Sequence, residues 1–519
     1  MVGPSGCGKT TLVKAMLGLL PAEGDRYFCG AVMERDVTLA GKVGYAPQFS
    51  IAHPALTVRE NLQDALDLCC SDETLKMERL GFVLNLTGLA DHQDKRAGSL
   101  SGGQLRRLGL AMELVGDPPC LVCDEVTSGL DPNSEQIILA LLRALVEDHG
   151  KTILCIIHNL GTLDRFDSIT VLQKGQVAFQ GSPDALKSYF GIEDFLHLYA
   201  EMDSGEVDWA QRWEESSGDP EEAGMVGGNE EPQDMLPTSL AQTRTLLRRR
   251  FRLLFRDHGY LGLLLAITFG FPLLVVIFAW NGLPEIEGLA LERSITSLES
   301  IQEDIRFRMD AAETAGLVTG LVMFQVILLA LAAANNGARE IAAERKLFEK
   351  ECFNGLRPGS YLASKLIFTA TLSLFQGAWM AFFVKAICQF PGSWFIQMII
   401  LGVGCMAMAW VCLGFSALLS NPEKANMLSI YLVGFQLPLS GVVLALPEAL
   451  VWLCRPFINA YWGWAGYLSS MRDSRLFDAF RMTDSSYLPS IGMALAVLVI
   501  QAACGLTMAY IGCRRRHGF

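Results

Sequence analysis

The sequence predicts two domains of different class: an α/β domain in the first part of the chain and an all-α domain of six long helices in the second. The chain has 519 residues, and a single hydrophobic core rarely grows beyond about 250–300 residues. Its residues are 51% hydrophobic and only 19% charged, whereas typical soluble domains are about 25% charged. Acidic residues gather near the middle of the chain. These observations favour a polar domain joined to a domain that lies in lipid.

The acidic cluster marks the predicted boundary between the two domains. Residues 201–240 carry twelve acidic side chains against one basic residue, Arg212, and so hold −11 of the formal net charge of −13. A segment this acidic, and rich in Gly, Pro and Ser, cannot bury enough apolar surface to fold alone. We therefore expect a first domain over 1–200, a disordered acidic linker over 201–240, a basic connecting helix over 241–258 and a membrane domain over 259–519. The acidic balance also argues against nucleic-acid binding, which needs a basic face.

A glycine-rich segment, GPSGCGKT, occupies residues 3–10. Its glycines allow backbone N–H groups to turn toward phosphates, while Lys9 reaches the β- and γ-phosphates and the Thr10 hydroxyl ligates Mg²⁺. Apolar residues at helical spacing follow, so the loop opens a helix whose N-terminus attracts an anion. The pattern predicts an ATP site made by Gly3, Pro4, Ser5, Gly6, Cys7, Gly8, Lys9, Thr10 and Thr11.

Three further segments supply groups that suit phosphate hydrolysis. The apolar run CLVCDE ends in Asp124, which is expected to join the metal shell, and in Glu125, which is expected to polarise the attacking water. His158 ends the apolar run TILCIIH, where an imidazole can contact a γ-phosphate, and Gln48 follows Tyr45-Ala46-Pro47, where an amide lies near metal or water. The predicted catalytic residues are Glu125, His158 and Gln48, and the predicted metal ligands are Thr10, Gln48 and Asp124.

The segment LSGGQ at residues 100–104 is a second glycine-backed start of a helix. Such an N-terminus suits a phosphate, so Ser101, Gly102, Gly103 and Gln104 are predicted to bind ATP. The segment SGLD, residues 128–131, follows the acidic pair closely.

The order and spacing of these six motifs resemble the ATPase domain of ATP-binding cassette (ABC) transporters. The resemblance implies an α/β P-loop NTPase fold with ATP and Mg²⁺ as cofactors. It also implies that two such domains pack head to tail, with ATP between the P-loop of one and the LSGGQ segment of the other. In that family a strand and an adenine-stacking aromatic precede the P-loop, whereas only Met1 and Val2 precede Gly3 here. We therefore expect the sequence to be incomplete at its N-terminus.

The second half of the chain contains long apolar runs. A membrane-spanning helix needs about 20 mostly apolar residues, and six runs qualify: 260–280, 315–334, 361–387, 395–419, 426–446 and 488–512. Basic residues gather before the first, between the second and third, and after the last, as the positive-inside rule requires of one side of a membrane. The pattern predicts a multi-pass protein of the plasma (inner) membrane with the ATPase domain and both termini in the cytoplasm.

Three shorter features of this half also predict local structure. Helical periodicity over 289–309 predicts an exterior helix, and the Trp-containing stretch 447–487 predicts an interfacial or re-entrant piece. Lys385 lies near the end of the third run, where we expect its amine to extend to the membrane surface.

The domain order resembles the G subfamily (White/pleiotropic-drug-resistance type) of ABC half-transporters, which implies a type-2 ABC exporter fold. Residues 344–365 resemble that group's segment between the second and third spans. The distance from Gly355 to Tyr361 is one residue shorter than in eukaryotic members, which favours a bacterial-type relative. The resemblance implies a second half-transporter as partner, a copy of this chain or, alternatively, a different one. It also implies a small lipid-like or amphipathic substrate between the second and fifth spans, where the candidates are Phe324, Gln325, Phe435 and Gln436; helix packing is the competing interpretation for each.

Together these features predict an ATP-hydrolysing exporter that acts as a dimer of half-transporters. One alternative is a mechanotransmitter that uses ATP to act on an external partner, although the sequence shows no large external domain between the predicted spans. The other is a transporter-derived scaffold without catalysis, which the intact Lys9, Ser101, Asp124, Glu125 and His158 argue against.

Overall fold

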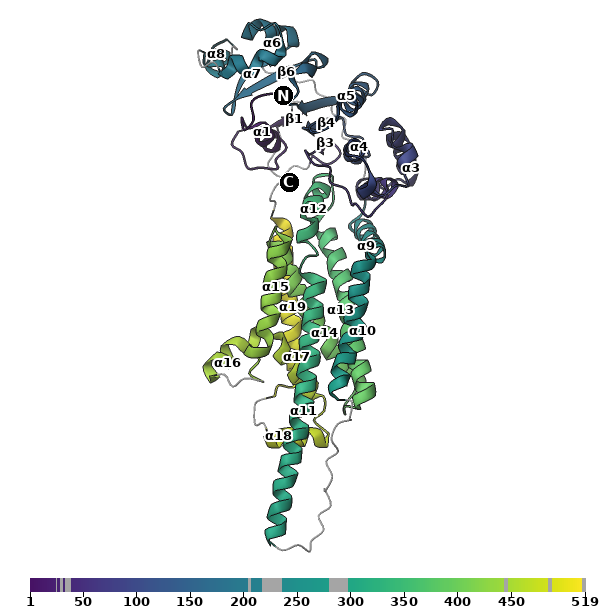
Figure 1. Cartoon of the computed structure of the whole chain (residues 1–519), viewed down its shortest axis with the longest axis vertical. Coiled ribbons are helices and arrows are strands. Elements are labelled where there is room, and N and C mark those ends of the chain that lie inside the picture. The colour runs from purple at the N-terminus through teal and green to yellow at the C-terminus, as the bar shows by residue number, and fades with distance from the viewer. Residues whose placement is uncertain are drawn as a thin grey trace. The chain divides into compact units, whose positions relative to one another are not determined.

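The computed structural model describes the chain apart from residues 25, 29–30, 33–38, 204–206, 217–235, 280–296, 443–446, 484–487 and 516–519. The described residues form two compact units, coloured by position in the chain in Figure 1. The α/β unit holds residues up to 249 together with 346–360, and the helical unit holds residues 250–345 and 361–515. An α/β part followed by an all-α part agrees with the fold class that the sequence predicts.

A parallel sheet lies at the centre of the α/β unit. Its strands run in the order β3-β4-β5, so that Cys123 of β4 lies opposite Cys155 of β5. Val2 pairs in parallel with Val171 of β6, and the Met1 carbonyl accepts a hydrogen bond from Ile157 N just after β5. The strands of this unit are β1 (Tyr27–Phe28), β2 (Ala31–Val32), β3 (Val43–Ala46), β4 (Cys120–Asp124), β5 (Thr152–Ile156), β6 (Ile169–Gln173) and β7 (Gln176–Gly181).

Helices α2 to α6 of the α/β unit begin at side chains that cap their free N–H groups. Thr57 and Glu60 form a capping box at the start of α2, and the Asp131 carboxylate accepts from Asn133 N and Ser134 N at the start of α5. The elements are α1 (Lys9–Met16), α2 (Val58–Cys69), α3 (Glu73–Leu86), α4 (Gly102–Leu114), α5 (Pro132–Glu147), α6 (Pro183–Phe190), α7 (Leu198–Asp203), α8 (Trp209–Ser216), and the 3₁₀ turns η1 (Ala90–His92), η2 (Ala97–Ser99), η3 (Leu160–Arg165) and η4 (Phe195–His197).

Part of the predicted acidic linker is folded. Helix α8 packs beside β7, with Trp209 only 3% exposed and its ring 4.6 Å from that of Phe190. Trp213 stacks on Phe179, with 5.2 Å between ring centroids. The prediction of a disordered segment is therefore wrong for residues 209–216, because two aromatic side chains supply the apolar surface that the average composition conceals. Most of the remaining linker, 217–235, lies outside the described residues.

Residues 346–360, which we call the returning segment, fold with the α/β unit although the helical unit flanks them in the chain. They include most of α12 (Arg345–Phe353) and the beginning of α13 (Pro358–Cys388). The first part of α9 (Ser239–Arg256), the predicted basic connecting helix, packs with them. Gln242 of α9 is fully buried; its amide donates to Leu68 O and Gly355 O and accepts from Arg357 N. Gln242 thus fastens the returning segment to both α9 and α2.

The helical unit is a bundle in which α14 packs along α11, α17 and α19 (Figure 1). Close approach between helices needs small residues: a Cβ on Gly505 of α19 would lie 2.6 Å from Trp410 O of α14, and one on Gly377 of α13 would lie 2.5 Å from Gly402 Cα. Its elements are α10 (His258–Phe278), α11 (Ser297–Gly337), η5 (Ala342–Glu344), α13, α14 (Trp394–Leu418), α15 (Pro422–Leu439), α16 (Glu448–Cys454), η6 (Arg455–Phe457), α17 (Asn459–Ser469), α18 (Arg475–Thr483) and α19 (Ile491–Arg514).

Five helices in the described part of the chain are long and apolar enough to cross a membrane: α10, α11 from Ala311 onward, α13, α14 and α19. The fifth predicted run, 426–446, corresponds to α15, which is not among them. That helix has only 18 residues, and its first turn carries Glu423 and Lys424. A sixth span therefore remains a prediction. The predicted exterior helix, 289–309, is described only from Ser297, where it continues into α11 as one helix.

Hydrogen bonds join some of the polar side chains inside the helical unit. The Asn336 amide donates to Gln376 Oε1 (2.7 Å), and Gln376 Nε2 donates to Thr268 Oγ1 (3.1 Å), which links α11, α13 and α10. Lys385 is 4% exposed and donates to Gly392 O (2.8 Å) and Gln397 Oε1 (2.9 Å). The prediction that its amine extends to the membrane surface is wrong, because carbonyl oxygens of the α13–α14 turn satisfy it inside the protein.

The Trp-containing stretch divides into buried and exposed parts. All residues of α17 are buried, including Trp462 and Trp464, whereas Trp452 of α16 is 67% exposed. α17 contacts α11, α14 and α19. An interfacial or re-entrant position for this stretch remains a prediction.

Candidate nucleotide-binding and catalytic site

In the glycine-rich loop, the lysine side chain hydrogen-bonds to backbone carbonyls of the same loop. Gly6 and Gly8 have φ values of +81° and +98°, a region that side chains other than glycine rarely adopt, and Gly8 is the N-cap of α1. The Lys9 amine is buried and donates to Gly3 O (2.8 Å) and Pro4 O (3.1 Å). The loop therefore has the folded form of a phosphate cradle, with Ser5 and Thr11 exposed and Cys7 buried.

Two of the three predicted metal ligands, Thr10 and Asp124, lie in contact, whereas the third, Gln48, donates to Glu125. The Thr10 hydroxyl donates to Asp124 Oδ1 (3.0 Å), and the Tyr45 hydroxyl donates to Asp124 Oδ2 (3.1 Å). Burial raises the pKa of the Asp124 carboxyl, against these two hydrogen bonds, which lower it. Hydroxyl and carboxylate oxygens are the ligands that Mg²⁺ prefers.

These oxygens fit a metal ion that is shared with phosphates. Within the described ranges, no group of three or more His, Cys, Asp or Glu side chains is placed to hold a metal alone. Mg²⁺ is usually held by one or two protein oxygens, with substrate phosphates and waters as the remaining ligands. Thr10 and Asp124 are the residues that would supply those protein oxygens to a metal ion bound next to the P-loop.

Two of the predicted catalytic side chains, Gln48 and His158, converge on the carboxylate of the third, Glu125. Glu125 accepts from Gln48 Nε2 at Oε2 (2.7 Å) and contacts His158 Nε2 at Oε1 (2.5 Å). Its φ is +55°, an uncommon value for a residue other than glycine, and such strain concentrates at functional sites. The Gln48 amide and the His158 ring thus fix the carboxylate from two sides at the end of β4.

The LSGGQ segment forms a second, separate helix start. Ser101 Oγ accepts from Gln104 N (3.3 Å) and Gln104 Oε1 accepts from Ser101 N (3.0 Å), which makes a capping box at α4. Ser101 and Gly102 are exposed, and a Cβ on Gly103 would lie 2.8 Å from Ser134 Oγ. Ser101 makes its polar contacts with residues of α4, and among the described residues no hydrogen bond joins it to the P-loop.

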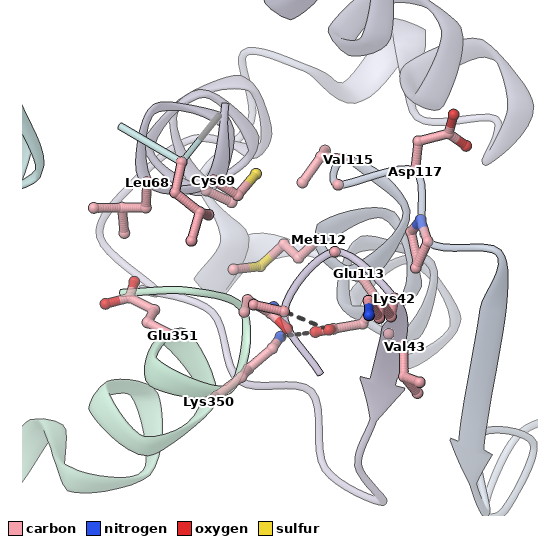
Figure 2. Close-up of a pocket in the computed structure, with 18 of the residues that line it drawn as sticks. Lys42, Val43, Leu68, Cys69, Met112, Glu113, Val115, Asp117, Lys350 and Glu351 are labelled. Atoms are coloured by element: carbon pink, nitrogen blue, oxygen red, sulfur yellow. Dashed lines mark hydrogen bonds and ion pairs between the residues drawn. The ribbon is translucent and has the colours of Figure 1, made fainter. Parts of the chain in front are cut away.

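A buried ion pair joins the returning segment to the helix that follows LSGGQ. Lys350 Nζ lies 2.6 Å from Glu113 Oε1, and the two side chains are 2% and 0% exposed. Asn354 Nδ2 donates to Glu113 Oε2 (3.1 Å). Figure 2 shows Lys350 directed from the returning segment toward Glu113, beside a cavity of about 630 Å³ that Met112 and Leu68 also line.

A second pair fastens the same segment to α9. Arg249 and Glu351 form a bidentate ion pair, and both side chains are almost wholly buried. Burial of this kind requires both partners to be present. In the sequence, Lys350 is one of several basic residues between the second and third apolar runs, and nothing there indicates the contacts of Glu113, Tyr45 or Gln242. Glu113 stands 237 residues before Lys350, and no local pattern indicates such a pairing.

The four candidate substrate residues differ in exposure. Phe435 of α15 is 59% exposed, and Phe324 of α11 packs against Phe278 with 5.6 Å between ring centroids. Gln325 is fully buried in α11, and Gln436 is 1% exposed, with its Oε1 accepting from Ala460 N (3.0 Å). Within one chain both glutamines therefore lie inside the bundle, as the packing interpretation expects, and a role in substrate binding remains a prediction.

Two family models match the chain. The model of the ABC transporter matches residues 1–128, which contain the P-loop, the LSGGQ segment and the acidic pair. The model of the ABC-2 type transporter matches residues 241–482. Both domains that the sequence predicts are thus found, in the predicted order.

Individual proteins match in the same regions. The ABC transporter ATP-binding/permease protein Rv1747 of Mycobacterium tuberculosis is 28% identical over 461 residues, which cover 85% of this chain and 50% of that protein. Nod factor export ATP-binding protein I of Burkholderia orbicola is 38% identical over 203 residues, covering 38% of this chain and 66% of that protein. Protein scarlet of Drosophila melanogaster is 36% identical over 210 residues, covering 37% of this chain and 30% of that protein. The chain therefore spans half the length of the mycobacterial relative.

These matches and the site geometry agree on one family. The P-loop, LSGGQ segment and acidic pair lie in the region of the first model, and the apolar helices lie mainly in that of the second. The chain belongs to the ABC transporters, with an ATP-binding domain ahead of an ABC-2 type membrane domain, in the half-transporter order of the G subfamily.

Proposed function

We propose that this chain is an ATP-hydrolysing half-transporter that acts as a dimer and exports a small lipid-like or amphipathic compound. The ATPase assignment rests on three groups of side chains: Lys9 in the P-loop, the pair Thr10–Asp124, and Glu125 held between Gln48 and His158. The export assignment is supported by the order of domains and by the Nod factor export protein among the relatives. We place the protein in the plasma (inner) membrane, with the ATPase domain and both termini cytoplasmic.

The geometry suggests a role for each residue. Lys9 and the P-loop N–H groups bind the β- and γ-phosphates of ATP, and Thr10 and Asp124 hold Mg²⁺, which neutralises phosphate charge when bound. Glu125 orients the attacking water and receives its proton as the oxygen bonds to the γ-phosphorus and the bond to the β-phosphate breaks. Gln48 and His158 keep the Glu125 carboxylate in place. Ser101 and the Gly102 and Gly103 amides of a second copy complete the site.

Chain continuity supplies the proposed route to transport. The returning segment belongs to the ATPase domain, yet α11 precedes it and α13 continues from it into the helical unit. We infer that a rearrangement of the ATPase domain on ATP binding displaces this segment and, through it, these two helices. Uptake into inside-out vesicles by the full chain, measured with a panel of lipids and amphipathic drugs, tests export; ATP-independent uptake, or none with any compound, contradicts it.

We expect Lys9→Ala to weaken ATP binding about 10- to 100-fold, because a charge-assisted hydrogen bond contributes about 1.5–3 kcal/mol. Equilibrium binding of ATP to the purified full chain measures the loss. Lys95→Ala, which removes an exposed lysine of the same domain, is the matched control and should bind ATP as the wild type does. Unchanged affinity in Lys9→Ala would remove Lys9 from the site.

A mixing experiment tests whether each ATP site combines two chains. Lys9→Ala and Ser101→Arg should each lack ATPase activity alone. In a mixed dimer of two-fold symmetry one site carries both defects and the other carries neither, so the mixture should regain turnover. Ser188→Arg, on the exposed surface of α6, controls for the added arginine. If each site lay within one chain, mixing would restore nothing.

A further inference from the structure

Tyr45 lies between the metal-binding carboxylate and the returning segment. It stands on β3, three residues before Gln48, and only 1% of its surface is exposed. Its hydroxyl donates to Asp124 Oδ2 at 3.1 Å, while Thr10 occupies the other oxygen, Oδ1, at 3.0 Å. Tyr45 therefore fixes the half of the carboxylate that the P-loop does not hold.

The ring of Tyr45 faces the returning segment. Phe353, at the end of α12, meets it edge to face, with 6.4 Å between ring centroids and 70° between the planes. Both rings belong to one apolar cluster with Val43, Val122 and Ile156. Side chains packed in contact can pass a small displacement from one to the next.

We propose that Tyr45 is a positioning residue with two contacts: it orients Asp124 toward the metal ion, and it carries a change in that carboxylate to the returning segment through Phe353. This inference rests on the proposed ATPase function and adds a residue to it. If Asp124 reorients when it binds the metal, Tyr45 must follow or leave a buried hydroxyl and carboxylate oxygen without their hydrogen bond. When Tyr45 moves with Asp124, its ring pushes on the ring of Phe353, and the backbone of α12 moves as well.

Two substitutions separate the two contacts. Tyr45→Phe keeps the ring against Phe353 and removes the hydroxyl, whereas Phe353→Leu keeps the hydroxyl and removes the partner ring. Tyr189→Phe is the matched control, because it removes a tyrosine hydroxyl that donates to a backbone carbonyl, Trp209 O (3.3 Å), in the same unit. All variants are made in the full chain in lipid nanodiscs.

The first measurement is equilibrium ATP binding as a function of Mg²⁺ concentration. Tyr45→Phe should raise the Mg²⁺ concentration for half-maximal binding about 2- to 10-fold, the loss expected for one hydrogen bond. It should leave ATP binding in EDTA unchanged. Phe353→Leu and Tyr189→Phe should keep the wild-type midpoint. A wild-type midpoint in Tyr45→Phe overturns the positioning role.

The second measurement is hydrogen–deuterium exchange of peptides from residues 346–360, with and without Mg²⁺ and ATP. The wild type and Tyr189→Phe should show a change on adding both, and Tyr45→Phe and Phe353→Leu should each lose at least about half of it, since either variant breaks the chain of contacts. An unaltered change in both variants overturns the transmission role, even if Tyr45→Phe folds poorly, because Phe353→Leu leaves β3 intact. Failure of the wild type to bind ATP with Mg²⁺ would instead reject the proposed function.

Discussion

Glu125→Gln is expected to lower the rate of ATP hydrolysis about 10²- to 10⁴-fold, the usual contribution of a general base, while ATP still binds. The carboxylate is the group on which Gln48 and His158 converge, at 2.7 and 2.5 Å. Glutamine has nearly the same shape, and the Gln48 amide can turn over to accept from the new NH₂ group. The substitution therefore removes the proton acceptor and leaves Lys9, Thr10 and Asp124 in place.

Single-turnover hydrolysis and equilibrium ATP binding, both on the full chain, separate these effects. The matched control is Glu135→Gln. The Glu135 carboxylate also accepts a hydrogen bond close to His158, from Nδ2 of the adjacent residue Asn159 at 3.1 Å. That variant should hydrolyse ATP at close to the wild-type rate. Near-normal hydrolysis by Glu125→Gln would show that another group accepts the proton.

Lys350→Met is expected to release the returning segment from the ATPase domain. The substitution leaves Glu113 wholly buried without its cation, and the loss of one partner from a buried ion pair costs about 3–5 kcal/mol. Asn354, the other donor to Glu113, is neutral and cannot compensate the charge. Transport should fall sharply, whereas ATP binding should persist because the P-loop is untouched.

Hydrogen exchange of residues 346–360 measures the release, and protection should fall about 10²- to 10³-fold for that loss of free energy. Lys346→Met removes an exposed lysine from the same helix and should change little. The double variant Lys350→Met/Glu113→Leu should recover much of the protection, because apolar residues often replace a buried ion pair without loss. If the single variant keeps wild-type protection, the pair does not fasten the segment.

The arrangement of the candidate site was predictable from the sequence because each of its motifs is local. The spacing of Gly3, Gly8 and Lys9 follows from one loop, and Asp124 and Glu125 follow one buried strand. Parallel strands then bring the ends of β3, β4 and β5 to one edge, so Gln48, Glu125 and His158 meet. Motifs of this kind can be identified from the sequence without knowledge of the tertiary fold.

The features that the sequence did not reveal depend on distant contacts or on a few large side chains. Lys385 reads as a lysine near the end of a span, and only the fold shows the carbonyl of Gly392 beside it. Helix α8 lies in an acidic stretch, and its Trp209 is buried because it packs against Phe190 and Tyr189, which the local sequence does not show. Composition and local sequence cannot reveal either contact, because they record neither which residue lies beside Lys385 or Trp209 nor how close it is.

The returning segment has a consequence for the synthesis of the protein. Ribosomes deliver a chain from its N-terminus, and domains generally fold as they emerge. Gln242, Glu113 and Arg249 each have a partner in residues 346–360, which are made after Arg250–Arg345. The carboxylate of Glu113, which is buried in the folded domain, therefore has no cation partner until the two apolar segments before residue 346 have been translated. A chain truncated before residue 346 leaves that carboxylate in water, whereas one ending after 360 can complete the domain.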